Sequence, residues 1–307
     1  MPKGVLPALV SRAGPRAVAL ETTLLLHGVP KGEGARLAQE LTAIAEGEGA
    51  SAALVGVHRG RPTVGMDQHE LSDLLGAERV PKANTSNLGL YLHAREHAAT
   101  TVATTMELAA AAGVRVFATG GLGGVHRGYG SHLDISADLA AFTRFPVAVV
   151  TSGVKSLLDV SATREVLETL GIPVVGFGTR DFPAFYLRSL GPGGPKVDAR
   201  FDDLDDLAAF VDAELTRTGR GVVVANPIPE RDELPRAHWD RWVAAAMSEA
   251  QRMGVNGRDV TPYILGALHR LSGGETLRAN VALVKHNVLV AARLAVRLGP
   301  GGPTPAP

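Results

Sequence analysis

A glutamate at the end of an apolar run is the first residue whose type and position suit chemistry. Glu21 follows the run AVAL and precedes two threonines. Partial burial at such a strand end would raise the pKa of the carboxyl group toward the range useful for proton donation. A glutamate that only forms an ion pair or caps a helix is the alternative interpretation.

Two lysines stand in comparable positions. Lys155 lies in the turn TSGVKS, directly after the apolar residues 147–150. A lysine there can lose contact with water, which favours the uncharged amine that attacks a carbonyl group and forms a Schiff base. The alternative is a lysine that extends into solvent from the mouth of a helix. Lys82 is either a point charge that binds phosphate or a surface residue.

A glycine-rich segment, TGGLGGVHRG, follows the apolar residues 114–118. Glycines let backbone N–H groups approach an anion closely, and His126 and Arg127 add polar groups. The spacing matches neither the nucleotide-binding G-x-x-x-x-G-K-[ST] motif nor G-x-G-x-x-G before a helix. A phosphate-binding loop and a tight structural turn therefore remain open.

Two carboxylates four residues apart follow in HLDISAD. If a helix begins here, Asp134 and Asp138 lie on one face, which suits Mg²⁺ or Mn²⁺ held through oxygen ligands and waters. Asp134 as the N-cap of a helix over 135–142 is the competing interpretation. Near the end of the chain, Asn280 and Asn287 share one face of a predicted apolar helix. Because buried amides need partners, we expect one to face a site and the other to bind a loop.

Short β-branched runs alternate with segments of helical period, which predicts an α/β fold with a largely parallel sheet covered on both faces. After about residue 238 only helical patterns occur. We expect one domain over 1–298 with a helical C-terminal subregion, and a disordered Gly/Pro tail over 299–307. Strands are predicted at 18–22, 52–57, 114–118, 147–151, 174–177 and 222–225, and helices at 34–48, 101–112, 156–170, 204–218, 238–253, 261–271 and 275–298.

The composition excludes several classes of function. The 31 basic residues cancel the 31 acidic ones, so no overall field attracts nucleic acid or an anionic membrane. The absence of cysteine excludes disulfides, thiolate metal sites and a cysteine nucleophile. With no long apolar segment, we expect neither export nor membrane insertion, and we place the protein in the cytoplasm.

Taken together, the segments resemble the pseudouridine-5'-phosphate glycosidase family. The matching segments are ALETT, ATTVATTM, VFATGGLGGVHRG, DISADL, SGVKSLLD, TLGIPVVG, PAF and VVVANPIPE. They occur in the same order as in the family, and the helix with the two asparagines follows them, so that the match covers about residues 19–298.

The resemblance implies a three-layer α/β/α fold around a largely parallel or mixed sheet, a homotrimer, and a divalent cation, Mn²⁺ or Mg²⁺. It also implies reversible cleavage of the carbon–carbon glycosidic bond of a small nucleotide, with Glu21 as proton donor and Lys155 as nucleophile. Asp134 would bind the metal. The implied substrate contacts are Lys82, Val102, His126, Ser136, Ala137, Asp138 and Asn280.

One segment departs from the family pattern. Lys82 is followed by Ala-Asn-Thr-Ser-Asn instead of a Ser-Arg-Arg-Asp type run, so two positive charges are missing. Arg127 is a candidate to replace them.

The alternatives are a Schiff-base aldolase or lyase on another sugar phosphate, and a nucleotide-binding regulator without catalysis. A (β/α)₈ barrel is the competing fold, although the helical C-terminal region argues against it.

Overall fold

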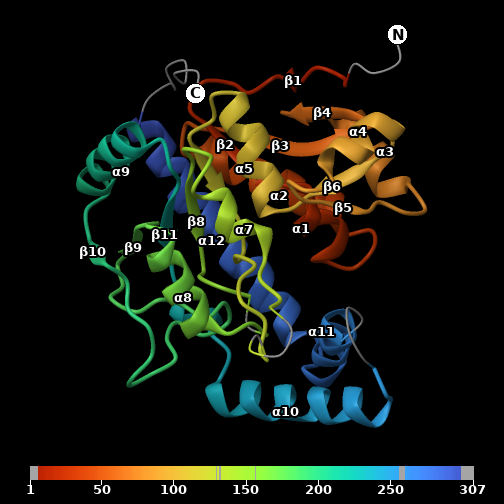
Figure 1. Cartoon of the computed structure of the whole chain (residues 1–307), viewed down its shortest axis with the longest axis vertical. Helices are drawn as coiled ribbons and strands as arrows, with labels where there is room; N and C mark the ends of the chain where they lie inside the picture. The colour runs from red at the N-terminus through yellow and green to blue at the C-terminus, as the bar shows by residue number, and fades with distance from the viewer. Residues whose placement is uncertain (1–5, 129, 131–132, 156, 256–259, 299–307) are drawn as a thin grey trace.

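One mixed sheet forms the centre of the molecule (Figure 1). The computed structural model describes residues 6–298, apart from 129, 131–132, 156 and 256–259. Within this part of the chain eleven strands belong to the sheet. They are β1 (Val10–Ser11), β2 (Ala17–Glu21), β3 (Ser51–His58), β4 (Arg61–Val64), β5 (Lys82–Ala83), β6 (Ala98–Thr100), β7 (Val116–Ala118), β8 (Ala148–Thr151), β9 (Val174–Phe177), β10 (Ala199–Phe201) and β11 (Val222–Ala225).

The strand order contains a switch point beside β2. The order is β1-β4-β3-β2-β7-β8-β11-β9-β10, and β5 and β6 extend from β3. β2 pairs in parallel with β3 on one side and with β7 on the other, whereas β4 and β6 run antiparallel to β3. In open α/β sheets, ligands bind outside the carboxyl ends of the strands at such a switch point.

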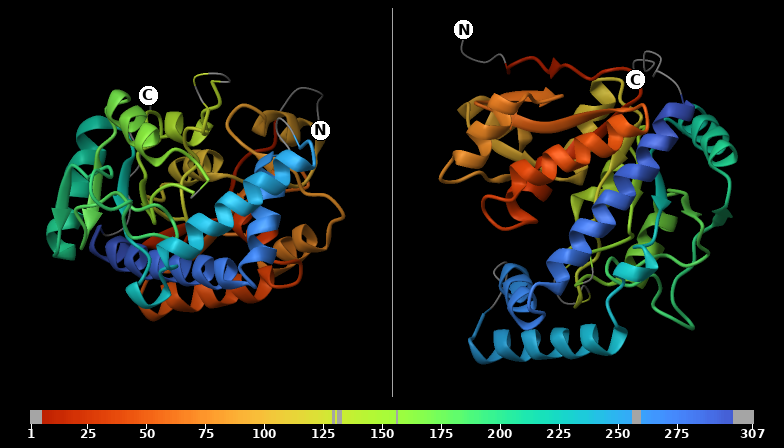
Figure 2. Two further views of the ribbon diagram at one scale, coloured as in Figure 1. Left: turned by 90° about the horizontal axis from the view of Figure 1, so that it is seen from below. Right: turned by 180° about the vertical axis from the view of Figure 1, so that it is seen from behind.

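Helices cover both faces of this sheet. On one face α12 packs against α2 and α9 and against β2, β7 and β8. On the other, α5 packs on β2 and β3, with α7 beside α5. Figure 2 shows the two layers on opposite sides of the strands. The helices of the two layers are α2 (Gly34–Gly47), α9 (Leu204–Thr218), α12 (Glu275–Leu298), α5 (Val102–Ala111) and α7 (Ala137–Ala141).

Two of the remaining helices lie beyond the sheet. α10 and α11 pack against each other below the sheet in Figure 1, and α12 then returns along its face. None of the described helices is long and apolar enough to cross a membrane. The bounds are α1 (Thr22–His27), α3 (Gln68–Gly76), α4 (Leu88–Ala94), α8 (Val160–Thr169), η1 (Glu230–Asp232), α10 (Arg236–Arg252) and α11 (Val260–Leu271).

The predicted α/β fold is confirmed, and all six predicted strands occur. The sheet has free edges at β1 and β10, so the barrel alternative is wrong. A helix over 135–142 was expected to begin after Asp134, but α7 begins at Ala137 because the Ser136 side chain accepts a hydrogen bond from its first turn. The predicted helix over 156–170 likewise begins later, at Val160, where Asp159 caps it. The predicted tail, 299–307, lies outside the described residues.

Candidate active site

Glu21 is the last residue of β2 and is only 4% exposed. Thr119, which follows β7, donates a hydrogen bond of 2.5 Å from its hydroxyl group to Oε1 of Glu21. The second carboxyl oxygen, Oε2, has no hydrogen-bond partner among the described residues. The carboxyl group therefore lies at the switch point of the sheet with one oxygen left for a ligand.

Burial raises the pKa of Glu21 above its ordinary value of 4.5. The positive charge of Lys155, the hydrogen bond from Thr119 and the charge of Lys82 act in the opposite direction, whereas the charge of Asp138 acts with burial. The expected rise in pKa is confirmed. A carboxyl group that keeps its proton to a higher pH can serve as a proton donor.

A tight turn carries Lys155 away from the end of β8. Gly153 has a φ of +77°, and a Cβ atom there would lie 1.8 Å from the carbonyl oxygen of Pro183. The turn is bonded to the glycine-rich segment, because the N–H of Lys155 donates to the carbonyl of Leu122 at 3.0 Å. Lys155 is exposed, which agrees with the alternative of a lysine that extends into solvent. Its amine remains open to a substrate.

Four backbone N–H groups of the glycine-rich segment are hydrogen-bonded within the protein. The N–H of Leu122 donates to Gly153 and that of Gly123 to Oδ2 of Asp138, each at 2.8 Å. The N–H groups of Val125 and His126 are also used, by the Thr163 hydroxyl and the Asp134 carbonyl. These four N–H groups are therefore used in a structural turn and are not free to bind a phosphate group.

The glycines are required by these close contacts. A Cβ atom at Gly121 would lie 2.6 Å from the ring of Phe185, and one at Gly123 would lie 2.3 Å from Oγ of Ser136. Such separations leave no room for a side chain. The segment is therefore held between the end of β7 and the start of α7.

Asp138 joins this segment to the beginning of α5. It is buried, and its Oδ1 accepts a hydrogen bond of 2.9 Å from the N–H of Ala103 while Oδ2 accepts from Gly123. Ser136 caps α7, Ala137 is its first residue, and Val102 is a fully buried residue at the start of α5. The predicted contact residues of this region thus lie together, although the Asp138 carboxylate already binds two backbone groups.

Lys82 lies close enough to Glu21 and Lys155 for their charges to interact. Partial burial lowers the pKa of Lys82, as does the charge of Lys155, whereas Glu21 raises it. The residue nevertheless keeps contact with solvent. His27, at the end of α1, is a neighbour that the sequence did not indicate: burial and the charge of Lys82 lower its pKa, and its Nε2 lies 3.0 Å from the carbonyl oxygen of Val80.

Asp134 and His126 form a separate, more exposed pair. Nδ1 of His126 lies 3.6 Å from Oδ2 of Asp134, whose side chain is 61% exposed. Asp134 precedes α7, so it does not share a helical face with the buried Asp138, and that prediction is wrong. Within the described part of the chain, no group of three or more His, Cys, Asp or Glu side chains could hold a metal ion. With the described residues alone, a cation at Asp134 would need further ligands from water or substrate.

Two buried polar atoms near the start of α1 and on α12 also lack partners. Asn280 donates from Nδ2 to the carbonyl of Gly28 at 3.2 Å, but its Oδ1 has no hydrogen-bond partner in the described structure. The same holds for the hydroxyl group of Thr23, two residues after Glu21. Buried polar atoms are rarely left unpaired, so ligand contacts would account for both.

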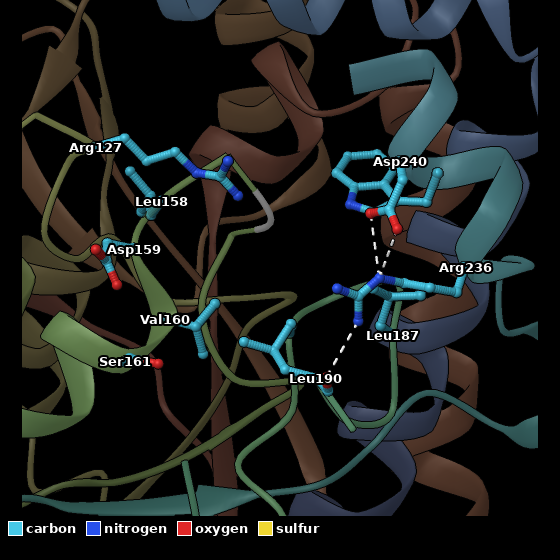
Figure 3. Close-up of a pocket in the computed structure, with 11 residues that line it drawn as sticks. Arg127, Leu158, Asp159, Val160, Ser161, Leu187, Leu190, Arg236 and Asp240 are labelled. Atoms are coloured by element: carbon cyan, nitrogen blue, oxygen red, sulfur yellow. Dashed lines mark hydrogen bonds and ion pairs between the residues drawn. The ribbon is translucent and has the colours of Figure 1, made fainter. Parts of the chain in front are cut away.

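A pocket of about 290 Å³ lies beside the lysine turn (Figure 3). Arg127 and Arg236 extend from its opposite walls, and Arg236 is bound to Asp240 at 2.9 Å. Glu21, Lys82 and Lys155 do not line this pocket. The structure therefore gives no support to Arg127 as a replacement for the missing charges after Lys82.

Comparison with known sequences identifies the family. The sequence model of the family described as Indigoidine synthase A like protein matches residues 8–297. The chain belongs to this family. Among curated relatives, the pseudouridine-5'-phosphate glycosidase of Nocardioides sp. is 44% identical over 286 residues, which are 92% of each chain. That of Deinococcus radiodurans is 43% identical over 95% of this chain and 93% of its own.

Two solved structures share the fold. The prealnumycin C-glycosynthase AlnA, in complex with ribulose 5-phosphate, is 32% identical, with a TM-score of 0.86 over 95% of this chain and 98% of its own. An indigoidine synthase A-like protein from Thermotoga maritima is 34% identical, with a TM-score of 0.85 over 95% and 97% of the two chains.

The sequence singled out Glu21 and Lys155 as candidates, but not the residues that contact them in the structure. The sequence offers one indication of Thr119 as a site residue, because Thr119 directly follows an apolar strand, just as Glu21 ends another. The contact between them depends on β2 and β7 being neighbours, which no local pattern predicts. His27 gave no comparable signal.

Proposed function

We propose that this chain is a pseudouridine-5'-phosphate glycosidase that cleaves the carbon–carbon bond between uracil and ribose 5-phosphate through a lysine imine. The observation that carries the proposal is the buried Glu21 carboxyl group, which has one unpartnered oxygen and is influenced by the charges of Lys155 and Lys82. Relatives of this name cover nearly the whole chain. The C-glycosynthase AlnA, which binds a pentose 5-phosphate, has the same fold.

The bond to be broken explains why a nucleophile and an acid are both needed. Carbon offers no lone pair for protonation, so the route of ordinary glycosidases is closed. Lys155 first gives its ammonium proton to water, which its exposure permits. The uncharged amine attacks the anomeric carbon, and Glu21 donates its proton to the ring oxygen as the bond between that oxygen and the anomeric carbon breaks. Glu21 then takes a proton from the new ammonium group of the open-chain adduct.

The second half of the reaction releases both products. The nitrogen lone pair forms the carbon–nitrogen double bond, the bond to C5 of uracil breaks, and its electron pair stays on the base. Glu21 returns its proton to C5. Water adds to the imine carbon, ribose 5-phosphate leaves as the aldehyde, the Lys155 amine is released and the proton returns to Glu21. We assign this role to Glu21 because both Asp138 oxygens already accept backbone hydrogen bonds.

The proposal extends to the groups around this pair. Lys82 would bind the phosphate group as a point charge. Val102, His126, Asn280 and residues 136–138 would line the substrate. Asp134 would hold Mn²⁺ or Mg²⁺ with waters, and the cation would offset negative charge on the substrate. We further propose a homotrimer that works in the cytoplasm.

Product analysis tests the proposal. Incubation with pseudouridine 5'-phosphate and Mn²⁺ should release uracil, followed by absorbance, together with an equal amount of ribose 5-phosphate. Sodium borohydride added during turnover should attach the pentose phosphate to the peptide that contains Lys155. An aldolase would use the same lysine without releasing uracil, and a regulator would bind the nucleotide unchanged; either result would reject the proposal.

A further inference from the structure

Asn287 connects the ends of three strands through one side chain. It lies on α12 and is fully buried. Its Nδ2 donates to the carbonyl oxygen of Thr119 at 2.7 Å and to Oγ of Ser152 at 3.1 Å. Its Oδ1 accepts a hydrogen bond of 2.9 Å from Nδ2 of Asn226. These three partners follow β7, β8 and β11, so one amide holds three neighbouring strand ends.

Two of these partners lead directly to the proposed catalytic groups. The hydroxyl group of Thr119 donates to Glu21, so the position of the Thr119 backbone decides where that hydroxyl group lies. Ser152 begins the turn that ends at Lys155, and its own Oγ also donates to the carbonyl of Asn226 at 3.0 Å. The Asn287 amide thus forms hydrogen bonds both to Thr119, which contacts the acid, and to Ser152, where the turn of the nucleophile begins.

We propose that Asn287 is a positioning residue that sets the placement of Glu21 relative to Lys155 by holding Thr119 and Ser152. The inference rests on the proposed function, since it concerns the geometry of that reaction. An acid and a nucleophile that act on one carbon centre need fixed separation, and a displacement of about 1 Å can cost roughly 10²-fold in rate. A fully bonded amide in a buried network can supply such rigidity.

Asn287→Ala tests this role. We expect kcat for uracil release to fall by about 10- to 100-fold while KM changes little, because Asn287 touches no substrate. Borohydride trapping on Lys155 should slow in parallel. Because the Thr119 hydroxyl group lowers the pKa of Glu21, its displacement should also move the alkaline limb of the kcat profile to higher pH. A residue that only stabilises the fold would not move this limb.

Leu294→Ala is the matched control, because Leu294 is fully buried on the same helix and has no polar contact. It should lower Tm as Asn287→Ala does, yet keep kcat and the pH profile. The double variant Asn287→Ala with Thr119→Val should lose less than the product of the two single losses, because both act on one contact. If Asn287→Ala does not fold, Asn287→Asp, which keeps the acceptor for Asn226, carries the same expectation.

The outcomes separate the two proposals. If the parent chain releases no uracil, the proposed function is wrong and the role of Asn287 falls with it. If the parent is active and the Asn287 variants keep its kcat and pH profile, only the positioning role is overturned. A pure rise in KM, or losses that multiply fully in the double variant, would overturn it as well.

Discussion

Glu21 combines two opposing influences within one side chain. Burial raises its pKa, while the charges of Lys155 and Lys82 and the hydrogen bond from Thr119 lower it. In the unfolded chain the carboxyl group ionises near its ordinary value of 4.5, but the folded protein holds the proton to a higher pH. Its contribution to stability is therefore fully present below about pH 4.5 and is lost as the pH rises through the folded-state pKa.

Glu21→Gln should abolish the loss of stability that Glu21 causes as the pH rises, and it removes the proposed proton donor. Relative to the parent chain, the variant should gain free energy of unfolding as the pH rises above about 4.5, and kcat should fall by about 10²- to 10⁴-fold. Glu107→Gln is the control, because burial raises the pKa of Glu107 too and its Oε2 also has no partner in the described structure. It should show the same sign of stability change with unchanged kcat. Urea unfolding and uracil release at several pH values measure both; parent-like kcat in Glu21→Gln would contradict the assignment.

Lys155→Ala should abolish uracil release and the borohydride adduct together. The fold should survive, because an exposed side chain is shortened and surface changes usually alter stability by only about 0.5 kcal/mol. Lys285→Ala, which removes a surface lysine that pairs with Glu40, is the matched control and should keep full activity. Peptide mapping of the trapped protein locates the adduct. An adduct on Lys82 would reverse the roles of the two lysines.

Removal of the cation should abolish activity if Asp134 binds a cation that the reaction requires. We expect no uracil release in excess chelator and recovery on addition of Mn²⁺, because Asp134 and waters offer the hard oxygen ligands that this cation prefers. Asp134→Asn should require more Mn²⁺ for half-maximal activity and should lose the rise in Tm that bound Mn²⁺ gives the parent. Asp212→Asn, a surface carboxylate paired with Arg115, should change neither. Full activity in chelator would remove the metal from the proposal.

At the level of elements, the sequence predicts strands better than their neighbours. The apolar runs at 174–177 and 222–225 match β9 and β11 residue for residue, because a short continuous apolar run bounded by turn residues identifies a buried strand. The short edge strands β1 and β10 carry no such signal. The contact of Glu21 with Thr119 depends on strand order, which is set by packing between distant segments.

The start of α7 illustrates a second limit. Asp134 and Ser136 are both good N-cap residues, so the local sequence allowed two helix starts. Ser136 caps the helix in the structure because the backbone of the preceding residues pairs with the glycine-rich segment: the N–H of His126 donates to Asp134 and the N–H of Ser136 to Gly124. Tertiary hydrogen bonds therefore determine at which residue α7 begins.

Gly153→Ala should break the turn that carries Lys155. The positive φ of Gly153 and the contact of an added Cβ atom with the carbonyl oxygen of Pro183 both oppose a side chain. We therefore expect a clear fall in Tm, and a fall in kcat that exceeds any change in KM. Gly178→Ala separates the two causes, because Gly178 has a φ of +66° but no atom within 4 Å of an added Cβ. It should lose about 1 kcal/mol of stability from the backbone alone, without a change in kcat. Equal effects of both substitutions would show that the Pro183 contact is unimportant.

At the level of the whole molecule, α12 is the element that unites the two halves of the sheet. It packs against α2 and α9 and crosses β2, β7 and β8, so its buried amides reach strand ends that lie far apart in the sequence. The prediction that one late asparagine binds loops is confirmed by Asn287. Sequence periodicity identified this helix, but only the layered arrangement shows which strand ends each asparagine meets.

Leu133 and Ile135 mark the surface where we expect the subunits of the proposed homotrimer to meet. Their side chains are 73% and 38% exposed on either side of Asp134, so two large apolar side chains lie in solvent close together in the sequence. Burial against a second copy would stabilise both side chains.

Light scattering of the parent chain should give three times its 32.0 kDa mass. The double substitution Leu133→Glu with Ile135→Glu should give the monomer mass, because each new carboxylate would have to be buried unpaired in the contact. Leu90→Glu places the same charge at another exposed leucine, 69% exposed on α4, and should leave the trimer intact. A parent chain that is monomeric would overturn the trimer. A trimer that survives the double substitution would place the contact elsewhere on the molecule.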